Sequence, residues 1–189
     1  KNAVRRSLNR VVVDGDESTN DSLFCTATSE AGKIPEKKFY DGLEAVCVSL
    51  AKQIAADGEG ATKMIEVTVN GCRHESDAEK IARAVVQSPL VKAAVYGEDP
   101  NWGRVVCAAG YSGVDFEVDE LSLSIGEKDG EVVLVNKGEI TADLVKAKEA
   151  MKGKRVVFTL TLESGKKSAT AWGCDLTEKY VEINGKYTT

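Results

Sequence analysis

Residues 57–63 (DGEGATK) place a carboxylate, Glu59, between two glycines directly after a pattern typical of a long amphipathic helix. Glycines allow the backbone to turn sharply and to approach a ligand closely. A carboxylate at the tip of such a loop is a natural partner for the amine of a small molecule. The same residues also fit a helix that stops at a glycine and leaves Glu59 in solvent, so both interpretations stay open.

The final residues, 184–189 (NGKYTT), are a second candidate because they form a polar tail that ends the chain on hydroxyl groups. Chain ends are often frayed, and this tail could be one of them. Tyr180, Ile183 and Tyr187 instead indicate a segment that docks on the protein. With residues 57–63, the tail predicts part of a small-molecule site.

Two further motifs resemble well-known loops without meeting their requirements. Residues 57–63 lack the Gly-Lys-Ser/Thr ending of a nucleotide-binding P-loop, and they follow a helix pattern rather than a strand. Residues 14–21 (DGDESTND) resemble a calcium loop, but the sixth and twelfth positions hold Thr19 and Cys25 instead of Gly and Glu. We interpret this acidic stretch as a connection stitched by polar side chains or as a loop that shapes a catalytic cleft.

No catalytic nucleophile or triad is visible in the sequence. The only histidine, His74, lies between Arg73 and Glu75 in a polar stretch, which favours a surface position. No serine lies in a nucleophile-elbow motif. The residues alone therefore indicate a soluble α/β protein with a ligand loop.

Composition and charge exclude several classes of protein. The net charge of -5 argues against a nucleic-acid partner, which would need a concentrated basic face. No apolar run is long enough to cross a bilayer, so no membrane partner is expected. The 5 cysteines are odd in number and include no CxxC pair, which predicts reduced thiols in a cytoplasmic protein, without disulfides or a metal site.

Hydrophobic periodicity predicts alternating helices and strands, hence an α/β or α+β class. Apolar residues at helical spacing predict a helix that ends at Asp57 and buries one face, made of Phe39, Leu43, Val46, Leu50 and Ile54. Strands are expected over residues 9–13, 23–28, 65–69, 121–125, 132–135, 156–162 and 169–174. A loop over residues 31–36, helices from Ser76 and over residues 140–151, and a short helix after Asp175 complete the prediction. The best boundary lies near Glu66, dividing residues 1–65 from residues 66–189.

Five motifs, in this order along the chain, are specific when taken together: SLNRVVVDGDESTND, AADGEGATK, SPLVKAAVYGEDPNWGR, GYSG and SATAWGCDLTEKYVEINGKYTT. They resemble the β chain of the ornithine acetyltransferases, also called bifunctional glutamate N-acetyltransferases. The resemblance implies a layered αββα sandwich with a second mixed α/β lobe. In that arrangement, residues 1–65 belong to the sandwich, and residues 66–189 form the second lobe with a tail that returns to the active site.

The resemblance also implies a reaction and its partners. Family members cut themselves into α and β chains, and the threonine that begins the β chain is the nucleophile, with its own amine as base. It moves acetyl from N-acetylornithine to glutamate by a ping-pong route in arginine biosynthesis. The implied partner is the α chain, which carries the oxyanion hole, in an α2β2 heterotetramer in the cytoplasm. No cofactor is implied beyond acetyl-CoA as an acetyl donor in some members.

Three positions match the family's substrate-binding residues: Glu59, Asn184 and Thr189. A carboxylate suits the substrate's ammonium group, while an amide and a hydroxyl suit its carboxylate or acetamide. The resemblance places the nucleophilic threonine upstream of Lys1, so this chain is expected to supply no catalytic residue. Two alternatives remain: a binding or structural subunit that kept the scaffold and lost the chemistry, and a related self-cleaving aminopeptidase.

Overall fold

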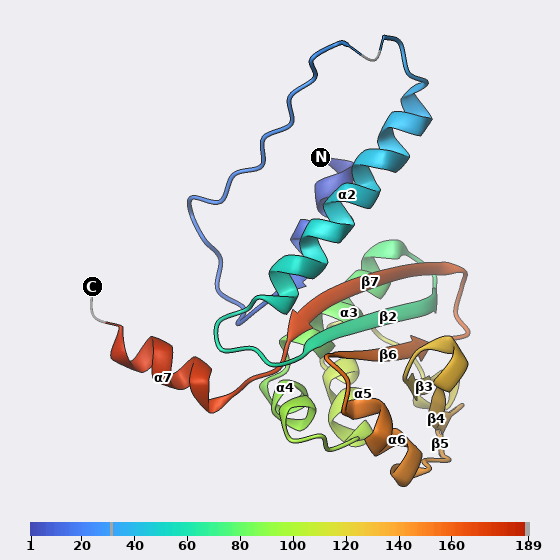
Figure 1. Cartoon of the computed structure of the whole chain (residues 1–189). Helices are drawn as coiled ribbons and strands as arrows, with labels where there is room; N and C mark the ends of the chain where they lie inside the picture. Colours follow the sequence, from blue (N-terminus) through green and yellow to red (C-terminus); the bar gives the residue numbers. More distant parts are fainter. Residues whose placement is uncertain (31, 188–189) are drawn as a thin grey trace.

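The computed structural model describes residues 1–30 and 32–187, which form one mixed seven-stranded sheet with helices on both faces (Figure 1). The strands lie in the order β1-β7-β2-β6-β3-β4-β5. Their bounds are β1 Val11–Val12, β2 Met64–Cys72, β3 Ser122–Ile125, β4 Val132–Asn136, β5 Glu139–Ile140, β6 Arg155–Thr161 and β7 Lys167–Cys174. The helices are α1 Asn2–Arg5, α2 Glu36–Ala56, α3 Glu75–Gln87, α4 Pro89–Tyr96, α5 Trp102–Gly110, α6 Leu144–Met151 and α7 Glu178–Lys186, with 3-10 turns η1 Leu8–Arg10, η2 Val118–Glu120 and η3 Lys128–Gly130.

The core forms around β2, which pairs parallel with β6 and antiparallel with β7. Successive side chains of a strand point to opposite faces of the sheet. Ile65, Val67 and Val69 therefore share one face, where they are fully buried in the cluster that contains the inward side of α3. Met64 points to the other face and packs with Trp172 of β7 against α2. The predicted α/β class is confirmed.

The long helix α2 begins and ends close to its prediction, with Asp57 as C-cap, but the prediction of its buried face is wrong. The sheet receives only the small residues Cys47, Ala51 and Ala55. Four of the expected core residues, Phe39, Val46, Leu50 and Ile54, are exposed, and Leu43 is half-buried. Small side chains allow the helix to approach the bulky Trp172 closely, so the larger apolar residues face away from the sheet.

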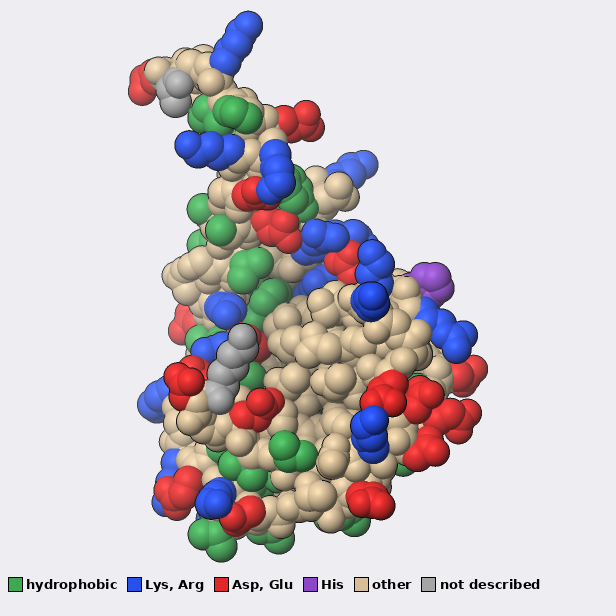
Figure 2. Space-filling view, turned by 90° about the vertical axis from the view of Figure 1, so that its right-hand side faces the viewer, with side chains coloured by type: hydrophobic (Ala, Val, Ile, Leu, Met, Phe, Trp, Pro, Cys, Tyr) green, Lys and Arg blue, Asp and Glu red, His purple; other side chains and the backbone are tan. Residues whose placement is uncertain are grey.

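Beyond the sheet, part of α2 and the segment before it project from the rest of the molecule (Figure 1). Figure 2 shows hydrophobic side chains among the charged ones along this projecting part. The strand predicted over residues 9–13 is present only as Val11–Val12, at the sheet edge. The strand predicted over residues 23–28 is wrong for this structure, because the segment meets no strand edge with which it could pair.

Several predicted boundaries shift for local reasons. Pro89 separates α3 from α4, and the Ser88 side chain caps the new helix by accepting from the Val91 amide. The helix predicted over 140–151 begins only at Leu144, because Asp143 caps it and Ile140 belongs to β5. α3 begins at Glu75, one residue before the expected start. Of the loop predicted over residues 31–36, position 31 lies outside the described residues and Glu36 already belongs to α2.

The predicted division between residues 65 and 66 falls inside β2, whose pairing with β6 and β7 continues on both sides of that point. The division into residues 1–65 and 66–189 stays a prediction. In the described ranges 1–30 and 32–187, none of the helices has the length and apolar character needed to cross a membrane.

Glu66 is a charged residue on the α2 side of β2, and it is nearly buried. Its carboxylate accepts from Arg155 Nη2 at 2.9 Å and from Trp172 Nε1 at 3.0 Å, and it lies 3.0 Å from Lys52 Nζ. Burial alone would raise the pKa of Glu66, but the hydrogen bonds from Arg155 and Lys52 outweigh it and hold the pKa below its ordinary value. The carboxylate therefore stabilises the fold while it is ionised.

We expect Glu66→Gln to lower the free energy of unfolding at neutral pH by about 1–2 kcal/mol, because two hydrogen bonds to a charged group are weakened. A lowered folded pKa gives stability that is complete above the unfolded pKa and is lost as pH falls through the folded value. The difference between wild type and variant should therefore shrink in acid, measured by urea unfolding at a series of pH values. Glu163→Gln, at an exposed pair with Lys137, is the control that should change little. A difference that is constant with pH would contradict this assignment.

Candidate functional site

The loop that carries Glu59 is held in place by Asp175, a buried carboxylate just after β7. One of its oxygens accepts from the backbone amides of Thr62 at 2.8 Å and Lys63 at 3.0 Å. The other oxygen accepts from the Thr62 hydroxyl. The Asp175 amide in turn donates to the Lys63 carbonyl at 3.0 Å. A loop fixed by four hydrogen bonds presents its tip residue in a defined position.

Glycine at position 60 allows this loop to lie directly against the first turn of α7. Gly60 has a φ of 68°, and a Cβ there would come within 2.7 Å of the Tyr180 backbone nitrogen. The Thr177 hydroxyl donates to the Gly60 carbonyl at 2.8 Å and also caps α7 by accepting from the Tyr180 amide. The loop and the C-terminal helix therefore form one unit.

The structure brings Glu59 and Asn184 together, although they are 125 positions apart in the sequence. Asn184 Nδ2 donates to Glu59 Oε2 at 2.7 Å and to the Tyr180 carbonyl at 3.1 Å. Both side chains are exposed, so a ligand can reach them. The third predicted residue, Thr189, lies outside the described residues.

Two further polar residues join this site. Tyr180 belongs to the tail that the sequence predicted to dock, and Asp14 begins the acidic stretch interpreted above as a connection or as a loop that shapes a catalytic cleft. The Tyr180 hydroxyl donates to Asp14 Oδ2 at 3.1 Å, which ties the start of the acidic stretch 14–21 to α7. Burial and the Asp14 carboxylate raise the pKa of Tyr180, and Asp16 and Glu59 act in the same direction. The surroundings are therefore acidic, which suits a cationic group such as an ammonium. No local sequence pattern could have predicted the contact of Asp14 with Tyr180, because the two residues are 166 positions apart and only the fold brings them together.

Lys92 of α4 holds the end of β7 in place next to the site. This lysine is buried, and its amine donates to the carbonyl of Cys174, the residue before Asp175. Burial lowers the pKa of Lys92, and burial also raises the pKa of the Cys174 thiol. A buried thiol with a raised pKa is a poor nucleophile. Neither group touches the Glu59 carboxylate, so we assign both to holding the strand end.

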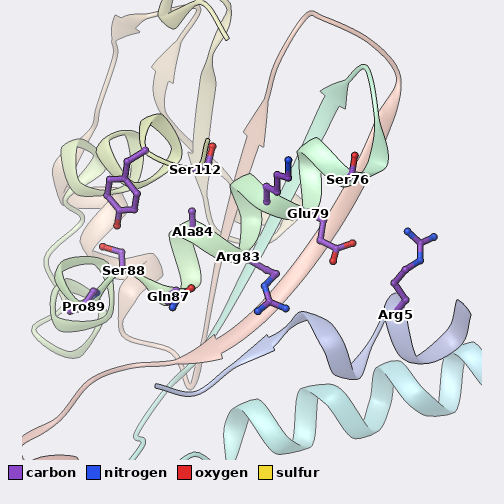
Figure 3. A pocket seen from close by; sticks show the side chains of 11 residues that line it. Arg5, Ser76, Glu79, Arg83, Ala84, Gln87, Ser88, Pro89 and Ser112 are labelled. Atoms are coloured by element: carbon purple, nitrogen blue, oxygen red, sulfur yellow. The ribbon is translucent and has the colours of Figure 1, made fainter. Parts of the chain in front are cut away.

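A hollow elsewhere on the molecule does not include Glu59 or Asn184. It lies along α3, and Figure 3 shows Ser76, Glu79, Arg83 and Gln87 from that helix at its wall. Two of its charged residues, Arg83 and Glu79, already have partners in the chain. Arg83 donates to the Asn9 carbonyl, and Glu79 accepts from the nearly buried Arg10. These two charges are therefore used in holding residues 9 and 10 to α3.

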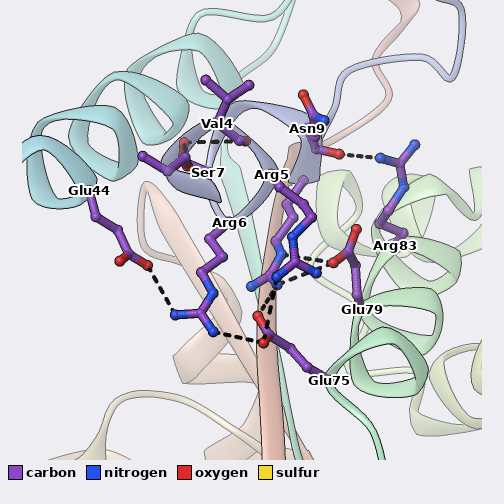
Figure 4. Close-up of polar contacts among 11 residues, drawn as sticks. Val4, Arg5, Arg6, Ser7, Asn9, Glu44, Glu75, Glu79 and Arg83 are labelled. Atoms are coloured by element: carbon purple, nitrogen blue, oxygen red, sulfur yellow. Dashed lines mark hydrogen bonds and ion pairs between the residues drawn. The ribbon is translucent and has the colours of Figure 1, made fainter. Parts of the chain in front are cut away.

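Ion pairs also connect Arg6 and Arg10, near the N-terminus, to the helices α3 and α2 (Figure 4). Glu75 accepts from Arg10 at 2.7 Å and from Arg6 at 2.8 Å, and Arg6 also pairs with Glu44 of α2. Burial opposes ionisation of Glu75, but these hydrogen bonds outweigh it and lower its pKa. We assign this cluster a structural role. Within the described ranges, no group of His, Cys, Asp and Glu side chains could hold a metal ion.

Comparison with known families shows to which family the chain belongs. The profile of the ArgJ family matches residues 1–189. The chain belongs to the ArgJ family. Its resemblance to ornithine acetyltransferases is thereby confirmed, since curated members carry matching names. A glutamate N-acetyltransferase from Methanosarcina mazei is 50% identical to the chain, over 100% of this chain and 49% of that protein. The arginine biosynthesis bifunctional protein ArgJ from Symbiobacterium thermophilum is 49% identical, over 100% of this chain and 48% of that protein.

A solved ArgJ family member shares the fold. The crystal structure of the arginine biosynthesis bifunctional protein ArgJ from Bacillus halodurans matches with a TM-score of 0.92 at 39% identity. The match covers 98% of this chain and 90% of that one. By contrast, this chain spans about half the length of the curated relatives it matches, 49% and 48% in the two cases above. The fold is thus that of the family, and the family's activity belongs to proteins about twice as long.

Proposed function

We propose that this chain is one half of an enzyme that moves an acetyl group from N-acetylornithine to glutamate in arginine biosynthesis. Relatives named for this chemistry match the full length of the chain. The observation that carries the proposal is the contact of Asn184 with Glu59 at 2.7 Å, on a loop that Asp175 holds rigid. A rigid, acidic and exposed pair of this kind can bind a cationic amino acid.

The two side chains divide the recognition of the substrate between them. The Glu59 carboxylate binds an ammonium group in a charge-assisted hydrogen bond. The Asn184 amide, which donates to Glu59 in the free protein, can donate to the carboxylate or acetamide of the same substrate. Thr189 is proposed as a third contact. The acidic surroundings of Tyr180 favour an approaching cation over an anion.

The acetyl transfer itself needs a nucleophile from the remaining half of the family's length. We propose that this is a threonine exposed when the precursor cuts itself, so that its free amine can act as base. Its hydroxyl attacks the acetyl carbonyl, ornithine leaves with the proton, and an acetyl-threonine ester remains. The amine of glutamate then attacks that ester, which yields N-acetylglutamate and restores the threonine. No cofactor takes part, and acetyl-CoA is a further acetyl donor in this scheme.

In the proposed assembly this chain is the β chain. The α chain comes from the same precursor and carries the oxyanion hole. Two copies of each chain form an α2β2 heterotetramer in the cytoplasm. The lengths of the chains support an assembly of two kinds of chain. This chain covers 90% of the solved Bacillus halodurans chain, but only 49% of the Methanosarcina mazei protein. The solved chain is therefore also about half as long as that relative.

The test is an assay of the full-length protein with N-acetylornithine and glutamate. We expect release of ornithine and formation of N-acetylglutamate in equal amounts, and an acetylated threonine detectable by mass spectrometry when glutamate is left out. A second assay with acetyl-CoA and glutamate tests the additional donor. Hydrolysis of peptides without any acetyl transfer would overturn the proposal in favour of an aminopeptidase, and binding of N-acetylornithine without turnover would overturn it in favour of a binding subunit.

A further inference from the structure

Lys63 ends the loop that carries Glu59, and only 10% of its side chain is exposed. Its amine donates to Glu98 Oε1 at 2.7 Å and to the carbonyl of Met151, the last residue of α6, at 2.6 Å. The last carbonyls of a helix have no partner within the helix and attract a cation. The Lys63 side chain therefore ties the loop to two segments that are 35 and 88 positions away in the sequence.

Glu98 adopts a backbone conformation that residues with a side chain avoid. In the part of the chain that the structure describes, only Ser29, Glu98 and Lys137 combine a side chain with a left-handed φ, and the value at Glu98 is 54°. Glycine is the usual residue for this conformation, yet the neighbouring Gly97 has an ordinary φ of -78°. A strained residue points to a use for that residue. The use visible here is the Glu98 carboxylate, whose pKa the hydrogen bond from Lys63 holds below its ordinary value.

The helix α4, which ends just before this turn, contacts the other parts of the site. The Lys92 amine donates to the carbonyl of Cys174 at the end of β7. A hydrogen bond to the Glu178 carboxylate, in the first turn of α7, raises the pKa of Tyr96, the last residue of α4. The helix and the turn after it thus touch the loop, the end of β7 and the start of the helix that carries Asn184.

We propose that Glu98 is a positioning residue for substrate binding, and that it acts on residues 57–63 through Lys63. With the Glu98 carboxylate present, the loop is fixed to the turn after α4, so the Glu59 carboxylate is held beside Asn184. Without it, the Lys63 amine keeps one of its two acceptors, and the loop can adopt more positions. The inference rests on the proposed binding of a cationic amino acid by Glu59, whereas the support of the loop is independent of acetyl transfer.

The variant Glu98→Gly, introduced into the full-length protein, separates positioning from stability. It removes the carboxylate, which is destabilising, but it also removes the strain, since glycine readily adopts a φ of 54°. We therefore expect a urea unfolding midpoint close to that of the wild type. The KM for N-acetylornithine should rise about tenfold, and kcat should stay within about twofold. A KM equal to that of the wild type would exclude a positioning role.

The matched control is Lys137→Gly. Lys137 also has a left-handed φ, 46°, and pairs with Glu163 at 2.6 Å. It lies in the turn between β4 and β5, at the end of the sheet opposite β1, so the same two effects on stability occur far from the loop. Both KM and kcat should remain those of the wild type. An equal rise in KM with both variants would show that the effect at Glu98 is not specific.

The variant Lys63→Met tests whether Lys63 transmits the effect, because it breaks the same pair from the other side. Substitutions that remove one shared contact are not additive. The double variant of Lys63→Met and Glu98→Gly should therefore show the KM of the single variants, about tenfold above the wild type. A rise of about a hundredfold, the product of the two, would contradict the route through Lys63.

Hydrogen exchange tests the support of the loop without any substrate. The amides of Thr62 and Lys63 should exchange about tenfold faster in Glu98→Gly than in the wild type or in Lys137→Gly, because the loop opens more often. Unchanged exchange would overturn the inference. Faster exchange in Glu98→Gly, together with a wild type that transfers no acetyl group, would instead count against the proposed function and leave the support of the loop by Glu98 in place.

Discussion

Glu59→Ala, introduced into the full-length protein, should lower kcat/KM for N-acetylornithine by about 10- to 100-fold. The reason is the loss of one charge-assisted hydrogen bond, worth about 1.5–3 kcal/mol, where a tenfold change in rate corresponds to about 1.4 kcal/mol. Folding should remain intact, because Glu59 is exposed and the hydrogen bond that its side chain makes, to Asn184, is also exposed. Steady-state kinetics and the urea unfolding midpoint measure the two effects separately.

Two further variants make this result specific. Glu59→Gln keeps an oxygen that can accept from Asn184 but removes the charge, so it should lose nearly as much activity as Glu59→Ala. Glu182→Ala removes an exposed carboxylate of the neighbouring helix α7, one that pairs with Lys179 and Lys186 at 3.0 Å, and should leave kcat/KM unchanged. If Glu59→Ala shows the kinetics of the wild type, Glu59 does not bind the substrate.

Asp175→Ala should lower the free energy of unfolding by about 3 kcal/mol. Asp175 is buried, and its removal leaves the amides of Thr62 and Lys63 without their acceptor. Each buried unsatisfied donor costs about 1–3 kcal/mol. The Glu59 loop should also lose its fixed position, so activity should fall even in samples in which the variant is fully folded. Urea unfolding measures the loss of stability. An activity assay under conditions in which the variant is folded measures the second effect.

Asp175→Asn is the conservative control. Its amide oxygen can accept from both backbone amides, and its NH2 group can donate to the Thr62 hydroxyl. We therefore expect Asp175→Asn to cost only about 1 kcal/mol and to keep most of the activity. If both variants were equally destabilised, the negative charge of Asp175, and not its hydrogen bonds to residues 62 and 63, would be the stabilising feature.

The error in α2 shows where sequence patterns stop. A helical repeat of Phe39, Val46, Leu50 and Ile54 correctly predicts a helix here, because apolar residues at that spacing form one stripe. The repeat contains no information about which stripe of the helix packs on the sheet. In this chain the sheet takes the neighbouring stripe of small residues, since only these fit against Trp172.

By itself, the sequence determined features that depend on neighbouring residues: the existence of α2 and its end at Asp57, the break at Pro89, the alternation along β6, and the motifs that identify the family. Only the tertiary structure decided which of these meet. Glu59 contacts Asn184 because β7 lies beside β2 in the sheet and Asp175, at the end of β7, receives the loop that precedes β2. Periodicity and capping act over a few residues, whereas strand order is set by burial of the whole core, and no local pattern encodes it.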